Sequence, residues 1–294
     1  MTIVNFGSIN LDFVYRVDRL ARPGETVSAL GQQQFAGGKG FNQSIALARA
    51  GAAPRHVGKV GEDGRWLVEM LEAEGVDISE VAVSTTATGH AIIQVDAQGE
   101  NSILVHGGAN HEIETESLER SCAALGEDDW VLLQNETNAL ATVMELAPVR
   151  GSRIVLNPSP MDPSLLALPL DRIDTFLINQ GEGEALCGER EPGRILEVMA
   201  ERFSRSAIVL TLGARGARYA RQEIRLECAA EPARARDTTG AGDTFAGYYL
   251  AEMVAGGDPE RALRLACSAA GYCVERAGAA ASIPRRSDLR IIGG

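Results

Sequence analysis

The sequence has little positive charge for its size. Its 294 residues include 28 Lys and Arg against 40 Asp and Glu, which gives a formal net charge of -12. A protein that holds DNA or RNA needs basic residues in excess, because neutralising phosphates supplies much of the binding energy. We therefore exclude nucleic acid as a partner. A phosphorylated ligand would have to find its positive potential locally, at backbone N–H groups, helix N-termini or a bound cation.

Cysteines and long apolar runs are also scarce. The five cysteines form no CxxC pair and are too sparse for a disulfide framework, so we interpret them as small core residues in a reducing compartment. The first residues, MTIVNFGSINLDFV, lack a basic flank, and polar residues interrupt their apolar run, so we expect no signal peptide. No stretch approaches the roughly 20 apolar residues that a membrane-spanning helix needs. We expect a cytoplasmic protein without a membrane partner.

The second half of the sequence alternates short apolar runs with amphipathic segments. Strand-like runs cover 131–134, 153–157, 176–179 and 207–212, and helical segments are expected near 138–148, 181–188, 194–205 and 241–278. An apolar run at 3–6 is typical of a further buried parallel strand. This alternation predicts an α/β fold, a doubly wound and mostly parallel sheet with helices on both faces. Without a linker or repeat, we expect residues 1–294 to form one domain.

Four other segments predict a second, smaller sheet. Residues 12–17 and 25–36 show strand-like alternation with polar residues on both faces, which suits an extension standing away from the main sheet. The strand-like segments 90–95 and 101–105 are separated by the turn-forming sequence DAQG. We predict that these four segments form a small β-sheet lid.

The strongest chemical motif is DTTGAGDTF at 237–245, directly before a helical segment. Small residues at a helix start gather free N–H groups and the positive helix end at one point, which makes an anion site. Asp243 would lie in the first helical turn, where it could also serve as a capping residue. A cap needs no glycines, whereas a phosphate approaching the backbone closely does. The motif therefore favours phosphate binding beside Asp243.

A second motif, GGKGFNQ at 37–43, leads into an apolar helical segment. Its glycines allow a ligand to approach the backbone, and Lys39 and Asn42 offer donors to hydroxyl groups. The alternative is an ordinary strand-to-helix turn. The Walker pattern does not fit, because no Ser or Thr follows the lysine.

Polar residues recur where predicted strands end. They are Asn10, Asp12, Glu136, Asn179, Glu182, Thr211 and Gly213. Ligands of open α/β sheets bind outside the carboxyl ends of the strands, so polar residues there indicate a site. Each one taken alone is as readily explained by a turn or a helix cap.

Together these motifs resemble the ribokinase-like (PfkB) carbohydrate kinases. The segments GSINLD, GGKGFNQ, GEDG, TLGARG and DTTGAGD occur in the family's order over nearly the whole chain. GGKGFNQ, and TGHAIIQVD followed by GENSILVHGGAN, resemble the branch that converts ribose to ribose 5-phosphate. The resemblance implies an ATP-dependent phosphotransferase with a doubly wound sheet and a small β lid, commonly used as a homodimer interface.

The resemblance also implies roles for single residues. Asp243 matches the general base, and Gly240, Ala241 and Gly242 match the backbone hole facing the transferred phosphate. Sugar-contacting positions correspond to Asn10, Asp12, Gly38, Lys39, Asn42, Glu136 and Asp243. Positions for ATP and Mg²⁺ correspond to Asn179, Glu182, Thr211, Gly213 and Gly216. A site for K⁺, formed mostly by carbonyl oxygens, corresponds to Asp237, Thr239, Cys273, Gly278 and Ser282.

Gln180, Asn135 and the pair Ala235-Arg236 before Asp237 depart from the family pattern, and two other functions stay open. Gln180 stands where a Glu is usual, which leaves the metal side one carboxylate poorer. Asn135 replaces a Leu before Glu136 and adds a polar group near the sugar. The chain could instead be a catalytically silent sugar- or nucleotide-binding regulator. It could also be another sugar or nucleoside kinase, because one exchanged hydroxyl contact can redirect specificity.

Overall fold

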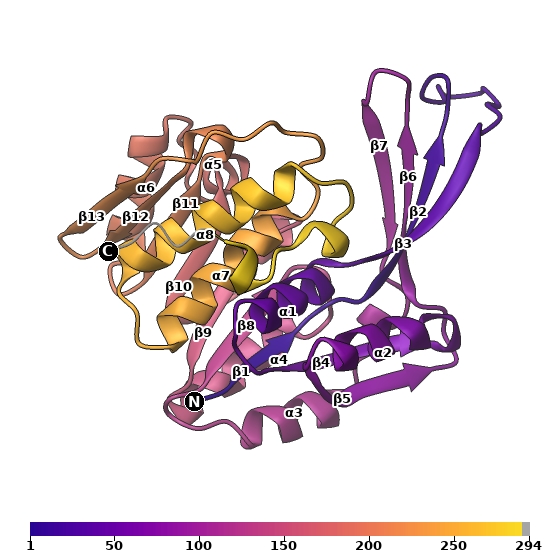
Figure 1. The fold of residues 1–294 in the computed structure, drawn as a ribbon. Helices are drawn as coiled ribbons and strands as arrows, with labels where there is room; N and C mark the ends of the chain where they lie inside the picture. Colours follow the sequence, from indigo (N-terminus) through magenta and orange to yellow (C-terminus); the bar gives the residue numbers. More distant parts are fainter. Residues whose placement is uncertain (290–294) are drawn as a thin grey trace.

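The computed structural model describes residues 1–289, which form one sheet of nine strands and one of four (Figure 1). The order across the large sheet is β13 (Ile224–Cys228), β12 (Ala217–Arg221), β11 (Ala207–Thr211), β10 (Thr175–Asn179), β9 (Arg153–Asn157), β8 (Trp130–Gln134), β1 (Ile3–Phe6), β4 (Pro54–Gly61) and β5 (Asp77–Ser84). Neighbouring strands from β5 to β11 pair in parallel, whereas β12 and β13 are antiparallel. The predicted mostly parallel sheet is confirmed.

Helices cover both faces of this sheet, because successive strand residues point to opposite sides. In β8, Leu132 belongs to one buried cluster, and Val131 and Leu133 belong to the other. The first cluster is covered by α1 (Lys39–Arg49), α2 (Arg65–Ala73), α7 (Ala241–Val254) and α8 (Pro259–Val274). The second is covered by α3 (Thr115–Ala123), α4 (Leu140–Leu146), α5 (Gln180–Cys187) and α6 (Pro192–Arg202). The predicted doubly wound arrangement, with helices on both faces of the sheet, is confirmed.

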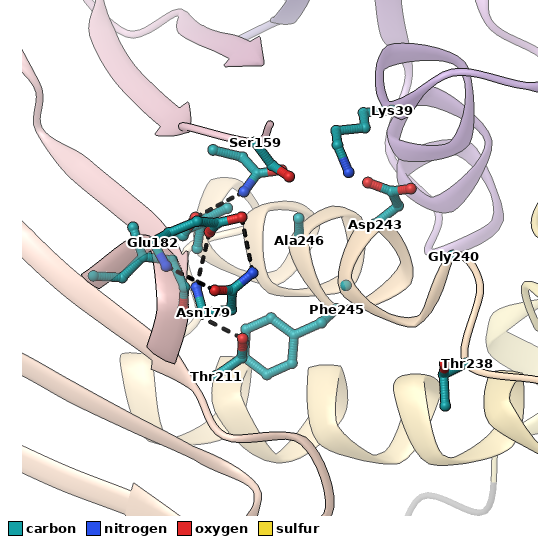
Figure 2. A pocket seen from close by; sticks show the side chains of 14 residues that line it. Lys39, Ser159, Asn179, Glu182, Thr211, Thr238, Gly240, Asp243, Phe245 and Ala246 are labelled. Carbon is teal, nitrogen blue, oxygen red and sulfur yellow. Dashed lines mark hydrogen bonds between the residues drawn. The ribbon is translucent and has the colours of Figure 1, made fainter. Parts of the chain in front are cut away.

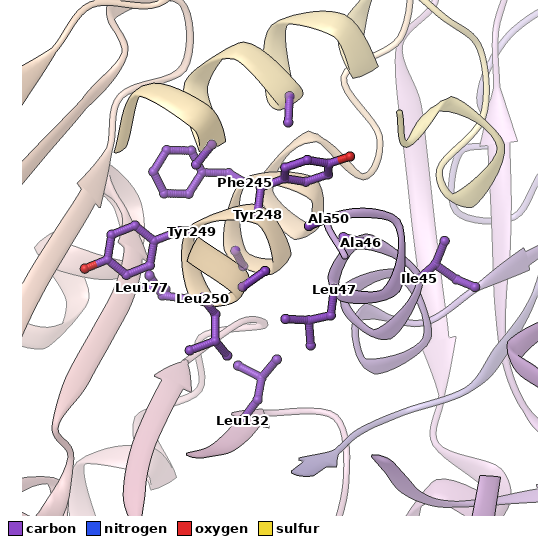
Figure 3. Close-up of a cluster of buried hydrophobic side chains, with 14 of the residues drawn as sticks. Ile45, Ala46, Leu47, Ala50, Leu132, Leu177, Phe245, Tyr248, Tyr249 and Leu250 are labelled. Carbon is purple, nitrogen blue, oxygen red and sulfur yellow. The ribbon is translucent and has the colours of Figure 1, made fainter. Parts of the chain in front are cut away.

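The contact between α1 and α7 positions the site. Figure 3 shows the two helices side by side over the sheet, with buried side chains between them. A Cβ on Gly247 would lie 2.4 Å from the Ala46 Cβ, so only glycine permits this approach. The helices run in parallel, since Asn42 and Gln43 meet Asp243 one turn before Ala46 meets Gly247. Two motifs about 200 residues apart in sequence thereby lie together.

The small sheet has the order β3 (Gly31–Gly37), β2 (Asn10–Arg16), β6 (Gly89–Val95) and β7 (Asn101–His106). It stands away from the large sheet (Figure 1). The turn at 96–99 joins β6 to β7 as predicted, with Gly99 N donating to Asp96 O. The prediction of a strand over 25–36 is wrong for residues 25–30, because the pairing between β2 and β3 ends at Arg16 and Gly31. Residues 17–30 form the connection, with a turn around Gly24 at a φ of 83°.

The predicted helical segment 241–278 consists of two helices, α7 and α8. The chain breaks between α7 and α8 at Gly256, which has a φ of 83°, and Gly257, whose N donates to Glu252 O at 3.0 Å. Asp258 then caps α8 through a hydrogen bond from Arg261 N. Short 3-10 helices at Glu62–Gly64, Gly108–His111, Ala147–Arg150, Pro163–Ala167, Leu170–Arg172, Gly213–Arg215, Ala280–Ser282 and Arg286–Asp288 lie in the connections.

All five cysteines are free, and Cys122, Cys267 and Cys273 are buried as predicted. Cys187 and Cys228 are half-buried instead. Within residues 1–289, no helix has the length and hydropathy needed to cross a bilayer.

Candidate active site

Asp243 lies in the first turn of α7, where the DTTGAGD motif predicts it. Its carboxylate is held by two amides of α1. Asn42 Nδ2 donates to Oδ2 at 3.0 Å, and Gln43 Nε2 donates to Oδ1 at 2.9 Å. Both oxygens thus accept bonds from another helix rather than from N–H groups of their own helix, which argues against a purely capping role.

The start of α7 also presents backbone donors. Gly240 precedes the helix with a φ of 77°, a left-handed conformation that favours glycine. First-turn N–H groups have no partner inside an α-helix. Gly242 borders open space, since no heavy atom beyond its chain neighbours and the adjacent backbone of α7 lies within 4 Å of the position a Cβ would take. This helix end can therefore accept an anion close to Asp243.

The start of α1 packs tightly on the loop after β1. A Cβ on Gly40 would lie 2.3 Å from Ser8 N, and Gly38 has a φ of 91°. Glu136, just after β8, joins the two segments by accepting hydrogen bonds from Ser8 Oγ and from Lys39 N. The glycines of GGKG are thus required by the packing of this strand-to-helix turn.

Acidic side chains surround Lys39 on this side of the site. Burial, and then the carboxylates of Glu136 and Asp243, raise the pKa of Asp12 to about 7, although Lys39 opposes the shift. Burial lowers the pKa of Lys39, but the carboxylates of Asp243 and Glu136 outweigh it and raise that pKa. Figure 2 shows the Lys39 amine pointing toward the Asp243 carboxylate. Lys39 therefore stays charged.

Two buried asparagines offer groups to a hydroxylated ligand. Asn42 Oδ1 is buried and has no hydrogen-bond partner among the described residues. It can accept a bond from a ligand hydroxyl while Nδ2 holds Asp243. Asn10 Oδ1 accepts from Asn110 Nδ2 at 2.7 Å, which fixes the Asn10 side chain.

A cavity of about 210 Å³ opens between α7 and the carboxyl ends of β10 and β11 (Figure 2). Its lining comprises Lys39, Asn157, Ser159, Leu177, Ile178, Asn179, Glu182, Thr211, Thr238, Gly240, Gly242, Asp243, Phe245 and Ala246. The structure thus brings the two glycine-rich motifs and the ends of β9, β10 and β11 to one cavity.

On the nucleotide side of the prediction, Asn179 and Glu182 form a capping box at the start of α5. Asn179 Oδ1 accepts from Glu182 N at 2.9 Å, and Glu182 Oε2 accepts from Asn179 N at 2.9 Å. Burial raises the pKa of Glu182. Both residues and Thr211 line the cavity, whereas Gly213 and Gly216 lie in the following loop and do not.

The five residues predicted for a monovalent cation lie in one network. Asp237 accepts from Thr239 N and from Gly278 N, each at 2.9 Å. Cys273 Sγ lies 2.9 Å from Ser282 Oγ and 3.8 Å from Thr239 O. Residues 1–289 contain no cluster of three or more His, Cys, Asp or Glu side chains that could hold a metal ion. A cation site built from main-chain carbonyl oxygens needs no such cluster of side chains.

Two of the departures from the family pattern are engaged elsewhere. Gln180 Oε1 accepts from Arg215 Nη2 at 2.6 Å, and its Nε2 donates to Arg190 O at 2.9 Å. Asn135 Nδ2 donates to Pro160 O at 2.8 Å, in the loop after β9. Neither side chain belongs to the cavity lining.

Sequence reasoning missed several residues of the site, including Asn157, Ser159 and Gln43. Asn157 ends β9 in register with Gln134 at the end of β8. The strand-end rule applied to the RIVLN strand would have found Asn157. Gln43 carried no local signal, because its importance comes from its hydrogen bond to Asp243, 200 residues away.

Comparison with known proteins gives a consistent result. The model of the pfkB family of carbohydrate kinases matches residues 2–286. A ribokinase of Haemophilus influenzae is 33% identical over 300 residues, covering 98% of this chain and 96% of the relative. The crystal structure of Cryptococcus neoformans ribokinase with ADP has a TM-score of 0.86 and 33% identity, with 98% of each chain covered. The structure of Arabidopsis thaliana ribokinase complexed with ribose and ATP has a TM-score of 0.84 and 32% identity, with 97% of this chain and 96% of that chain covered.

Proposed function

The chain belongs to the pfkB family of carbohydrate kinases, and we propose that it transfers the γ-phosphoryl group of ATP to ribose, giving ribose 5-phosphate. Relatives that match over nearly the full length are named ribokinases, and one solved relative is complexed with ribose and ATP. The observation that carries the proposal is the Asp243 carboxylate, held by two amides at a helix N-terminus beside the cavity.

In this mechanism Asp243 takes the proton from the attacking sugar hydroxyl. The backbone N–H groups of residues 240–243 stabilise charge on the transferred phosphoryl group, as an anion hole does. Phosphoryl transfer depends more on in-line positioning and charge stabilisation than on covalent chemistry. Sugar contacts are assigned to Asn10, Asp12, Gly38, Lys39, Asn42 and Glu136. Closure of the small sheet over the sugar would exclude water and suppress ATP hydrolysis.

The cavity also fits a phosphate-bound Mg²⁺. Such an ion takes one or two protein carboxylates and keeps several waters. Besides Asp243, Glu182 is the carboxylate that lines the cavity in the described residues, and Asn179 lies next to it. When bound, Mg²⁺ neutralises charge on the phosphate oxygens. A chelator should abolish ADP formation, and Mg²⁺ should restore it; activity unchanged in the chelator would contradict this assignment.

Activation by K⁺ is proposed for the network of Asp237, Thr239, Cys273, Gly278 and Ser282. The hydrogen bond from Gly278 N to Asp237 joins the segment after α8 to the segment before α7, so a cation held by their carbonyl groups would order the adjacent anion hole. We expect higher kcat in K⁺ than in Na⁺ or a bulky organic cation at equal ionic strength. Equal rates in all three would remove the proposal.

A homodimer through the small sheet is proposed from its exposed face. Phe35 and Val105 are 41% and 51% exposed. Ile103, two residues from Val105 in β7 and therefore on the same face, is 55% exposed. An apolar face of this kind is typical of an interface. Sedimentation should give twice the monomer mass, and a monomer at assay concentrations would overturn the proposal.

A cytoplasmic location is proposed because the reaction consumes ATP and free cysteines persist there.

The substrate test measures ADP formation with ribose, fructose, ketodeoxygluconate, adenosine and related nucleosides. We expect ribose to give the highest kcat/KM. If another acceptor exceeds it by about tenfold, which is about 1.4 kcal/mol, the ribose assignment is wrong while the kinase assignment survives. The absence of turnover with every acceptor would favour the silent regulator instead.

A further inference from the structure

A chain of buried side-chain amides lies beneath the catalytic carboxylate. Gln134 and Gln43 are both fully buried. Gln134 Nε2 donates to Asn5 Oδ1 at 2.9 Å and to Gln43 Oε1 at 2.8 Å. Gln43 Nε2 donates to Asp243 Oδ1 at 2.9 Å and to Asn157 Oδ1 at 3.0 Å. The chain therefore runs from β8 through α1 to Asp243.

Main-chain carbonyl groups fix the direction of every amide in this chain. Asn5 Nδ2 donates to Gly40 O at 2.8 Å, so Asn5 must present its oxygen to Gln134. Asn157 Nδ2 donates to Leu177 O at 3.0 Å, so Asn157 must present its oxygen to Gln43. A carbonyl accepts only, and each asparagine is therefore held in one orientation.

Gln43 has a single allowed orientation as a result. If its amide were reversed, its oxygen would face the oxygens of Asp243 and Asn157, and its NH₂ would face the NH₂ of Gln134. Buried groups of like polarity facing one another lose their hydrogen bonds and pay the full desolvation penalty. Gln134 keeps its own orientation even though its Oε1 has no hydrogen-bond partner within residues 1–289, because reversal would set that oxygen against two acceptors.

We propose that Gln43 is a positioning residue for Asp243 and that Gln134 sets its orientation. Asn42 holds the second carboxylate oxygen, and with Gln43 it fixes the plane of the carboxylate against the start of α7. A general base works only when its lone pair is aimed at the proton it removes. The inference rests on the proposed role of Asp243 as that base.

The test replaces Gln43 by methionine, which has a similar length and no N–H donor. We expect kcat to fall by about 10-fold to 100-fold, the loss typical of a misplaced catalytic group. The KM values for ribose and ATP should change by less than about threefold, because the backbone donors and sugar contacts remain. Gln134→Met should lower kcat in the same direction but less, because Gln43 keeps its bonds to Asp243 and Asn157 and loses only the donor to its Oε1.

The matched control is Ser44→Ala. Ser44 is the next residue of α1, is fully buried, and accepts from Asn5 Nδ2 at 2.8 Å on the side of the network away from Asp243. Its loss should cost a similar amount of stability and leave kcat unchanged. If Ser44→Ala lowers kcat as much as Gln43→Met does, the effect is structural and the proposal is overturned.

The decisive readout repeats Gln43→Met in an Asp243→Asn background. A positioning residue has nothing left to position there, so the second substitution should add no further loss in kcat. Additive losses would overturn the proposal. If Gln43→Met does not fold, Gln134→Met in both backgrounds gives the same readout. If Asp243→Asn alone leaves kcat intact, the proposed base is wrong; if it lowers kcat and Gln43→Met does not, only the present inference fails.

Discussion

Asp243→Asn tests the proton-accepting role with the smallest change in shape. In the native protein both carboxylate oxygens accept amide N–H donors, from Asn42 and from Gln43. Asparagine keeps one acceptor, but its NH₂ must face one of those two donors. The resulting buried mismatch should cost about 1–3 kcal/mol of unfolding free energy, so the assay must run well below the variant's Tm.

The chemical loss should be larger than this structural one. An amide cannot take the hydroxyl proton, so kcat should fall by about 10²–10⁴-fold. That factor corresponds to about 3–5 kcal/mol of activation free energy. ATP affinity should change far less, because the helix N-terminus that binds phosphate is intact. ADP release with ribose, fitted for kcat and both KM values, measures the two effects separately.

Asp258→Asn is the matched control for this prediction. Asp258 is the N-cap of α8, and its side chain accepts from Arg261 N at 2.9 Å. Asparagine caps helices about as well as aspartate, so Tm and kcat should both stay near their native values. A folded Asp243→Asn protein that keeps more than about a tenth of native kcat would refute the general-base assignment.

Three further outcomes are expected. Gly242→Ala should raise Tm slightly, because alanine stabilises a helix by about 0.5–1 kcal/mol relative to glycine and the new methyl meets no other part of the protein. The kcat/KM for ATP should nevertheless fall. An unchanged kcat/KM would show that phosphate does not approach this turn. Asp12→Asn should stabilise the protein more at about pH 8 than at about pH 4. Burial, and then Glu136, raise the native pKa of Asp12 from 3.8 to about 7, so the wild type loses stability as pH rises between those values; equal Tm differences at both pH values would contradict this. Gln180→Glu should leave Mg²⁺ activation unchanged, because the side chain pairs with Arg215 outside the cavity; a shift of about tenfold in the Mg²⁺ requirement would contradict it.

The large sheet could be predicted because its information is local. Apolar runs such as RIVLN and FLIN became β9 and β10, and the segments between them became helices, as the alternating pattern requires. The resemblance of GGKGFNQ and DTTGAGD to a kinase family then located the two helix starts. Both starts line the cavity, at Lys39 and at Gly240, Gly242 and Asp243.

The errors came from boundaries that depend on tertiary pairing. Residues 25–30 alternate like a strand, but no partner strand extends beyond Arg16, and so β3 begins only at Gly31. The double glycine at 256–257 ends α7 where helical periodicity alone suggested continuation. The chain of buried side-chain amides could not be predicted from the sequence either, because the hydrogen bond from Gln43 to Asp243 joins residues 200 positions apart.

The charge distribution of the cavity explains how an acidic chain can handle ATP. Among the cavity-lining residues of the described part of the chain, Lys39 is the basic one, and Asp243 and Glu182 are the acidic ones. Lys39 is held charged mainly by the carboxylates of Asp243 and Glu136, and these carboxylates in turn neutralise much of its positive potential. Side chains therefore supply no net attraction for the phosphates. In the proposed mechanism the attraction would come from the N–H groups at the start of α7 and from a divalent cation carried with the nucleotide, and both act only on a ligand placed at that helix end. In the proposed mechanism such an acidic cavity would bind phosphate by position rather than by overall charge, and the same position would present the phosphoryl group to Asp243.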